Sequence, residues 1–215
     1  MLFNNKNALI YIVDDDFSIC DSLKTLLESK GRLVKCFQSA EGFLNNYDPA
    51  YPGCLLLDVT MPLMSGLELQ QELSKINIHI PIIFISGNSS IQELAKAFRA
   101  GALDFLEKPF NYAVLLKRID EAIERDIENK QKMHQTSKVQ AGFDRLTARE
   151  KEVLQLIVSN HSNKESARIL NISHRTIDAH RARVMEKMQA ENVTALVSMV
   201  MNNNLLNSPL KHQES

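Results

Sequence analysis

The hydrophobic and polar positions of residues 1–125 alternate between two patterns. Short, unbroken apolar runs are separated by stretches in which apolar residues recur at the three- to four-residue spacing of a helix. Apolar runs without in-and-out alternation are typical of strands buried on both faces of a parallel sheet. The pattern predicts strands at residues 9–13, 33–37, 54–58, 81–86 and 103–106. It predicts helices at residues 18–30, 39–47, 65–76, 91–99 and from 112 onward.

The alternation of strands with helices narrows the fold class of this first half. Neighbouring parallel strands need a long crossover connection, and a helix is the usual crossover element. Right-handed crossovers leave helices on both faces of the sheet. We therefore expect residues 1–125 to form an α/β domain with a doubly wound, five-stranded parallel sheet.

The rest of the chain has the pattern of a linker followed by a small all-helical domain. Residues 126–142 are polar, and we expect the last helix of the first domain to reach about Lys132 before a linker begins. Within residues 143–215, helices are predicted at about 147–159, 163–170, 174–188 and 194–202. A three-residue turn joins the second and third of these helices, which predicts a helix-turn-helix.

Composition and charge suggest two globular domains with different partners. The 215 residues are 44% hydrophobic and 24% charged, and no apolar stretch approaches the ~18 residues of a membrane span. Residues 1–125 carry a net charge of −4, whereas residues 143–215 carry +2 and four of the six histidines. The basic second domain points toward nucleic acid, and the lack of a long apolar stretch predicts that nothing spans a membrane.

The cysteines indicate the cellular compartment in which the protein is found. Cys20, Cys36 and Cys54 lie in apolar segments without CxxC spacing, which favours free thiols over disulfides or zinc ligands. Residues 1–13 lack the cleavage site of a signal peptide. We therefore expect a cytoplasmic protein.

Four of the five predicted strands end in, or lead into, residues that can take part in chemistry. In chain order these are Asp14, Asp15 and Asp16; Asp58; Ser86; and Glu107, Lys108 and Pro109. In an open parallel sheet the binding crevice lies at the carboxyl ends of the strands. Carboxylates that converge there repel one another, and Mg²⁺ together with a phosphate is the usual remedy. With a lysine and a hydroxyl nearby, Asp58 on the middle strand is the natural nucleophile for phosphoryl transfer.

These residues stand in motifs that resemble the receiver domain of bacterial two-component response regulators. The motifs are Ile12-Val13-Asp14-Asp15, Leu57-Asp58-Val59-Thr60-Met61-Pro62, Ile85-Ser86 and Glu107-Lys108-Pro109-Phe110. The resemblance covers residues 8–125 and implies a flavodoxin-like fold in which a sensor histidine kinase phosphorylates Asp58. It also implies a Mg²⁺ ion, held by the acidic pair Asp14 and Asp15, by Asp58 and by the backbone carbonyl of Thr60.

The same resemblance gives roles to the residues that would respond to phosphorylation. Lys108 would pair with the phosphoryl oxygens, and its peptide bond to Pro109 would be cis. Ser86 would be the switch hydroxyl and Phe105 the switch aromatic residue. Leu63 stands where a glycine is frequent in the family, so we expect the loop after Asp58 to be less free.

The second domain resembles the LuxR-type helix-turn-helix domain over residues 144–202. The likeness rests on Leu146-Thr147-Ala148-Arg149-Glu150, Ser162-Asn163-Lys164-Glu165, Arg175-Thr176-Ile177 and Lys187-Met188. The recognition helix would be 174–188, with Ile177, Val184 and Met188 facing the core. The expected DNA contacts are Lys164, His174, Arg175, Thr176, Asp178, Ala179, His180, Arg181, Ala182 and Arg183.

Two positions depart from the LuxR-type pattern. Asn160 stands where a glycine is usual, and asparagine tolerates the left-handed conformation better than most residues. Ser166 replaces a branched aliphatic residue, which predicts weaker packing of helix 163–170.

Together the two domains resemble the NarL/FixJ class of regulators, closest to its FixJ-like branch. The resemblance implies a transcription factor and not a dedicated enzyme, although Asp58 would accept a phosphoryl group and release it slowly. Its partners would be a sensor histidine kinase, promoter DNA, RNA polymerase and, once phosphorylated, a second copy, and transcription would be activated.

Two alternative functions differ from this one in kind. A Mg²⁺-dependent phosphatase or phosphotransferase on a similar sheet would need an Asp-x-Asp nucleophile motif on the first strand, whereas Asp14 and Asp15 are adjacent. A constitutive DNA-binding protein with a vestigial receiver is the other alternative. The intact set of Asp14, Asp15, Asp58, Ser86 and Lys108 argues against it.

Overall fold

The computed structural model describes residues 7–87 and 90–206. The chain divides into two compact units, Met1–Gln131 and Lys132–Ser215. The assignments made above for residues 1–6, 88–89 and 207–215 lie outside the described residues.

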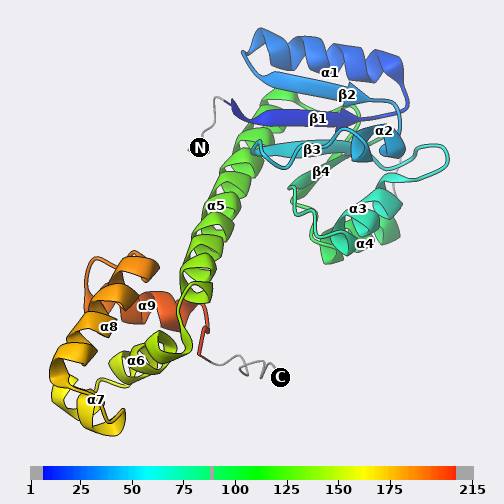
Figure 1. The fold of residues 1–215 in the computed structure, drawn as a ribbon. Helices are drawn as coiled ribbons and strands as arrows, with labels where there is room; N and C mark the ends of the chain where they lie inside the picture. The colour runs from blue at the N-terminus through cyan, green and yellow to red at the C-terminus, as the bar shows by residue number, and fades with distance from the viewer. Residues whose placement is uncertain (1–6, 88–89, 207–215) are drawn as a thin grey trace. The chain divides into compact units, whose positions relative to one another are not determined.

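The first unit is built on a five-stranded parallel sheet with the strand order β2-β1-β3-β4-β5 (Figure 1). The strands are β1 (Leu9–Val13), β2 (Leu33–Phe37), β3 (Gly53–Asp58), β4 (Ile82–Ser86) and β5 (Asp104–Glu107). Every residue of β1, β3 and β4 is buried, which explains their unbroken apolar sequences. The predicted fold class and all the strands are therefore confirmed, with ends shifted by at most one residue.

Helices cover both faces of this sheet. They are α1 (Phe17–Ser29), α2 (Ala40–Leu44), α3 (Gly66–Lys75), α4 (Ile91–Arg99) and α5 (Tyr112–Asp144). One core cluster joins the sheet to α1 through Leu23 and Leu27 and to α5 through Leu115 and Ile119. The cluster on the other face takes residues from α2, α3 and α4. Each face of the sheet thus has its own apolar core.

The end of α5 corrects the sequence-based prediction. The helix was expected to reach about Lys132 and then to give way to a linker within 126–142, but it continues to Asp144. The polar composition of this stretch does not prevent a helix, because Lys, Gln, Glu and Met are good helix formers even where no apolar face is buried. Residues 131–138 are all exposed, so the apolar periodicity on which the prediction relied is missing there.

Two polar contacts, the first of them buried, hold the first part of α5 against its surroundings. The carboxylate of Asp126 accepts the backbone N–H of Gly53, at the start of β3, over 2.9 Å. One turn later, Nζ of Lys130 donates to the carbonyl of Pro49 over 2.8 Å. A side chain at position 53 is excluded, because an added Cβ would lie 2.0 Å from the carbonyl oxygen of Leu9.

The described part of the second unit, up to residue 206, contains four further helices around one apolar core. They are α6 (Ala148–Val158), α7 (Asn163–Ile169), α8 (His174–Met188) and α9 (Val193–Asn202). Ile177, Val184 and Met188 of α8 are buried in this core, as predicted. A capping box of Thr147 and Glu150 opens α6, and the buried carboxylate of Glu150 also accepts Nζ of Lys187 over 2.6 Å.

The two departures from the LuxR-type pattern have different consequences. Asn160 adopts a φ of 60°, so the left-handed turn after α6 survives without the glycine. Ser166 of α7 is 1% exposed, and its hydroxyl has no hydrogen-bond partner among the residues that the structure describes. A buried hydroxyl without a partner keeps its full desolvation cost.

Replacing Ser166 by alanine should therefore stabilise the helical domain. We expect Ser166→Ala to raise its free energy of unfolding by about 1 kcal/mol, because the unpaired hydroxyl is removed and little volume is lost. The matched control is Ser162→Ala in the same helix, which removes the N-cap hydroxyl and should cost about 1 kcal/mol. Hydrogen exchange of the α6 and α8 core amides measures both, and a destabilised Ser166→Ala variant would contradict the assignment.

Candidate functional site

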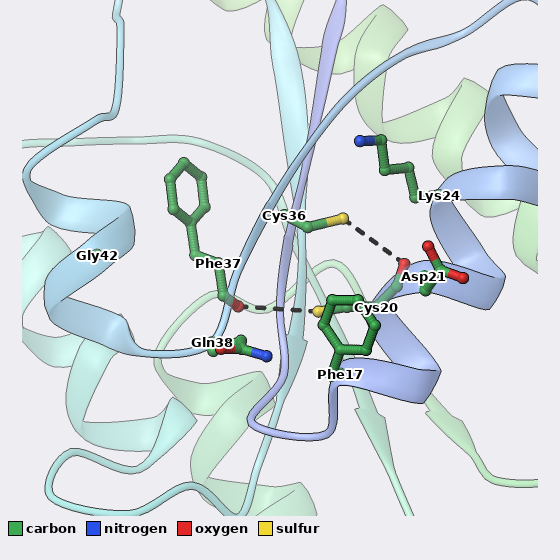
Figure 2. A pocket seen from close by; sticks show the side chains of 8 residues that line it. All are labelled: Phe17, Cys20, Asp21, Lys24, Cys36, Phe37, Gln38 and Gly42. Atoms are coloured by element: carbon green, nitrogen blue, oxygen red, sulfur yellow. Dashed lines mark hydrogen bonds between the residues drawn. The ribbon is translucent and has the colours of Figure 1, made fainter.

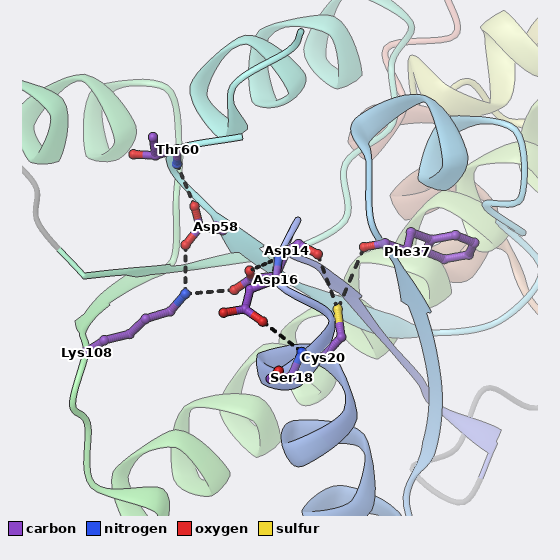
Figure 3. Close-up of polar contacts among 8 residues, drawn as sticks. All are labelled: Asp14, Asp16, Ser18, Cys20, Phe37, Asp58, Thr60 and Lys108. Carbon is purple, nitrogen blue, oxygen red and sulfur yellow. Dashed lines mark hydrogen bonds and ion pairs between the residues drawn. The ribbon is translucent and has the colours of Figure 1, made fainter. Parts of the chain in front are cut away.

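Two buried carboxylates and one lysine meet at the carboxyl end of the sheet. Nζ of Lys108 lies 2.7 Å from Oδ2 of Asp14 and 2.8 Å from Oδ1 of Asp58 (Figure 3). Asp14 follows β1, Asp58 ends β3 and Lys108 follows β5, so three strands supply the group. Asp14 is 4% exposed and Asp58 is 7% exposed, so both carboxylates have given up most of their contact with water. We call these three side chains the carboxylate–lysine cluster.

Backbone N–H groups fix the orientation of both carboxylates. Thr60 donates its N–H to Oδ2 of Asp58 over 2.6 Å, and Asp16 donates its N–H to Oδ1 of Asp14 over 3.0 Å. Asp16 itself serves as the N-cap of α1, since its carboxylate accepts the N–H of Ser18. Gly66 lets the start of α3 approach β3, because an added Cβ would lie 2.1 Å from the carbonyl oxygen of Asp58.

The electrostatics of the cluster are unbalanced. Burial raises the pKa of Asp58 above its usual value, and the opposing effect of Lys108 does not fully compensate for it. Burial alone would lower the pKa of Lys108, but its contacts with Asp14 and Asp58 outweigh that effect and raise it. One ammonium group therefore pairs with two carboxylates, and the desolvation of ionised Asp58 is not fully offset by this pairing.

The other residues predicted for this site lie around the carboxylate–lysine cluster and do not contribute side chains to it. Ser86 is buried at the end of β4, and its carbonyl accepts the N–H of Lys108 over 2.7 Å. Phe105 is half-buried and stacks on Phe84 with 6.1 Å between the ring centroids. The peptide bond between Lys108 and Pro109 is cis. Asp15 and Thr60 are exposed, so their side chains remain outside the carboxylate–lysine cluster.

The oxygen atoms at this edge of the sheet fit a hard divalent cation, although three or more carboxylates of the described residues do not converge there. Within the described residues, no group of three or more His, Cys, Asp or Glu side chains could hold a metal ion. Mg²⁺, however, needs only one or two carboxylates beside carbonyl oxygens and water. Asp14, Asp58 and Lys108 together carry one net negative charge, and the adjacent Asp15 adds a second, so the site has charge for a cation to neutralise.

The loop after Asp58 contains an unusual backbone conformation. Leu63 has a φ of 65°, in the left-handed region, and its side chain is fully exposed. A leucine there costs roughly 1–2 kcal/mol relative to its preferred conformations, and glycine would avoid that cost. The conformation agrees with the expectation that a glycine is the ordinary residue at this position.

On the helical domain, most of the predicted DNA contacts lie together on the open side of α8. The exposed residues are Lys164 of α7 and His174, Arg175, Thr176, Asp178, Ala179, Ala182 and Arg183 of α8. His180 and Arg181 are half-buried and lie nearer the core side of the helix. Asp178 has internal partners that the sequence did not reveal, because its carboxylate accepts Nδ2 of Asn163 over 2.6 Å and lies 3.2 Å from Nδ1 of His174.

Comparison with known proteins decides the family. Residues 10–120 match the response regulator receiver domain, and residues 144–200 match the bacterial regulatory proteins of the luxR family. The chain is a response regulator. Its receiver and LuxR-type domains make it a two-component transcription regulator and not a dedicated enzyme, so the phosphatase alternative is wrong.

Relatives similar over nearly the whole chain support this assignment. Response regulator protein TmoT of Ectopseudomonas mendocina is 42% identical over 90% of this chain and 88% of its own length. FixJ of Rhizobium meliloti is 38% identical over 89% of this chain and 94% of its own. A solved structure of the response regulator StyR aligns with a TM-score of 0.86 at 37% identity and covers 91% of this chain and 99% of that one.

A receiver implies a sensor kinase as partner, and a helix-turn-helix implies DNA binding. No helix among residues 7–87 and 90–206 is both long and apolar enough to cross a membrane.

The raised pKa of Asp58 predicts how stability depends on pH. At neutral pH the buried carboxylate is ionised at a net cost to the folded state. As the pH falls through the raised pKa toward the usual value of 3.8, protonation occurs first in the folded protein and removes this cost. Asp58→Asn should therefore be more stable than the wild type at neutral pH, and its advantage should shrink as the pH falls.

Urea unfolding in metal-free buffer, followed by circular dichroism, measures this difference. Asp15→Asn is the matched control, because it removes the same charge from an exposed neighbouring position. Asp15→Asn should change the stability little, both at neutral pH and at acidic pH. A stability gain for Asp58→Asn that did not vary with pH would show that the charge of Asp58 is not its origin.

Proposed function

We propose that Asp58 is the phosphoacceptor of this regulator and that its phosphorylation by a sensor histidine kinase promotes dimerisation and promoter binding. The observation that carries the proposal is the contact of Lys108 with both Asp14 and Asp58 at the end of the middle strand. A carboxylate buried beside an ammonium group is oriented for attack on a phosphorus atom, and the lysine can then pair with the transferred oxygens.

The proposed magnesium site uses the residues around this contact. Asp15, Asp58 and the backbone carbonyl of Thr60 would hold the ion, and Asp14 would help to orient it. When bound, Mg²⁺ neutralises the charge of the phosphoryl oxygens during transfer. The chain's own part is to keep Oδ1 of Asp58 free of bulk water while the Thr60 N–H holds Oδ2 at 2.6 Å. Lys108 donates to Oδ1 over 2.8 Å, so both oxygens of the carboxylate are oriented before the transfer.

Ser86 and Phe105 connect this chemistry to the neighbouring surface. Phosphorylation adds negative charge and acceptor oxygens beside the buried end of β4, where Ser86 can donate its hydroxyl. Ser86 moves toward the phosphoryl group, and Phe105 turns from its partly buried position into the space that becomes free. The surface of α4 and β5 changes as a result and supports the dimer.

Substitution of the acceptor tests the first step. Asp58→Asn should abolish incorporation of a phosphoryl group from a small-molecule phosphodonor with Mg²⁺, because an amide cannot serve as the nucleophile. Asp16→Asn is the matched control, since Asp16 caps α1 and does not contact Lys108. It should retain phosphorylation at a rate within about threefold of the wild type, because asparagine is an equally good N-cap. Phosphoprotein gel electrophoresis measures both variants, and phosphorylated Asp58→Asn would show that the acceptor lies elsewhere.

We infer that the open face of α8 enters the major groove of promoter DNA. Its small residues Ala179 and Ala182 are exposed between basic side chains, which allows a close approach to base edges. Lys164, Thr176 and the arginines of α8 would contact phosphates or guanines. A dimer would place two such helices on half-sites about one helical turn, roughly 10 bp, apart and would recruit RNA polymerase to activate transcription.

The DNA contact can be tested at Arg175, which is exposed in the first turn of α8. If Arg175 contacts a base, Arg175→Ala should weaken binding to a duplex selected by the wild-type protein by roughly 1–3 kcal/mol. If it contacts only a phosphate, the slope of log binding constant against log salt concentration should fall by about 1. Lys138→Ala, which removes an equal charge from exposed α5, should change neither quantity. Equal binding by both variants would contradict the assigned face.

The oligomeric state and the DNA affinity, measured with and without a phosphodonor, distinguish a phosphorylation-dependent switch from a vestigial receiver. If the phosphodonor causes wild type, but not Asp58→Asn, to dimerise and gain DNA affinity, the proposed switch holds. Binding indifferent to the phosphodonor would favour the constitutive alternative.

A further inference from the structure

Two of the three cysteines, to which the proposed function gives no role, lie close together beside an open cavity. Figure 2 shows Cys20 of α1 and Cys36 of β2 on adjoining walls of this cavity, whose volume is about 490 Å³. Sγ of Cys36 lies 3.6 Å from the carbonyl oxygen of Cys20, and Sγ of Cys20 lies 3.9 Å from the carbonyl oxygen of Phe37. Each sulfur therefore lies within 4 Å of the backbone of the other cysteine or of its neighbour.

The two thiols differ in access. Cys36 is half-buried and lines the cavity, whereas Cys20 is 3% exposed. Both cysteines line the cavity, and the sulfur of Cys36 is the more accessible of the two to a solute that enters it. The nearby Cys20 side chain, and then the charge of Lys24, lower the pKa of Cys36, which favours its reactive thiolate.

We propose that Cys20 and Cys36 form a redox-active dithiol that a hydroperoxide converts to an intramolecular disulfide. In the first step the sulfur of Cys36 attacks the peroxide, so an S–O bond forms, the O–O bond breaks and an alcohol or water leaves. In the second step Cys20 attacks the resulting sulfenic acid. The S–S bond forms, the S–O bond breaks, and the thiol proton of Cys20 leaves with the hydroxyl group as water.

The third cysteine provides an internal comparison. Cys54 is 0% exposed in the central strand β3, and burial raises its pKa above the usual value. It shares neither the cavity nor a hydrogen bond with the other two cysteines among the described residues. Reaction of Cys36 with a polar alkylating reagent should therefore be at least about tenfold faster than reaction of Cys54 in the folded protein.

The same geometry gives oxidation a structural consequence. The thiol of Cys20 donates to the carbonyl of Asp14 over 3.4 Å, and a disulfide has no hydrogen to donate. Oxidation therefore removes one contact at the end of β1, where Asp14 enters the carboxylate–lysine cluster (Figure 3).

Peptide mapping of the full chain tests the proposal. The reduced protein is exposed to hydrogen peroxide, its remaining thiols are alkylated, and a digest is analysed without reduction. We expect a peptide linked through Cys20 and Cys36 within one chain, with Cys54 alkylated only after denaturation. Unlinked Cys20 and Cys36, or a linkage that involves Cys54, would overturn the proposal without affecting the assignment of Asp58.

Variants separate the two steps. In Cys20→Ala the reaction should stop at the sulfenic acid of Cys36, so labelling by dimedone should rise, whereas Cys54→Ala should still form the disulfide. Circular dichroism confirms that each variant is folded. If dimedone labelled Cys36 no more strongly in Cys20→Ala than in the wild type, Cys20 would not be the resolving thiol.

Discussion

The contact of one lysine with two buried carboxylates is the constraint on which the receiver depends. Asp14 and Asp58 are nearly excluded from water, and burial of an unpaired carboxylate is costly enough to shift its pKa or unfold the site. Lys108 reaches both carboxylates, and its own backbone N–H is held by the carbonyl of Ser86. The ends of β1, β3, β4 and β5 are therefore fixed relative to one another by the same residue.

The sheet makes this contact possible through its register. Val13 pairs with Leu57, and Asp58 pairs with Ile85, so Asp14 and Asp58 lie at one level of the sheet and Ser86 lies one residue beyond it. Ser86 in turn pairs with Glu107, which places Lys108 two residues beyond the level of Asp58. Because register in a buried sheet is fixed by packing on both faces, the apolar runs determine the chemistry at their ends.

The sequence predicted the features that repeat and missed those that depend on single contacts. Buried strands and amphipathic helices leave a periodic pattern, so β1 to β5 and α8 were found almost to the residue. The exposed part of α5 buries no apolar face, and its helix could be predicted only from intrinsic propensity, which the polar composition concealed. The contacts of Asp178 with Asn163 and His174, and the approach of Cys20 to Cys36, depend on side-chain directions that no spacing rule encodes.

The two domains show why a buried ion pair is not always a functional one. In the helical domain Glu150 has one lysine, Lys187, and the Thr147 cap; although burial opposes ionisation, these contacts prevail and lower its pKa. That carboxylate is satisfied, and it stabilises the fold. In the receiver two carboxylates share one lysine, and burial leaves the pKa of Asp58 raised. A group that the fold leaves incompletely neutralised gains most from a cation and a phosphoryl group, which is the physical argument for our proposal that Asp58 is the acceptor.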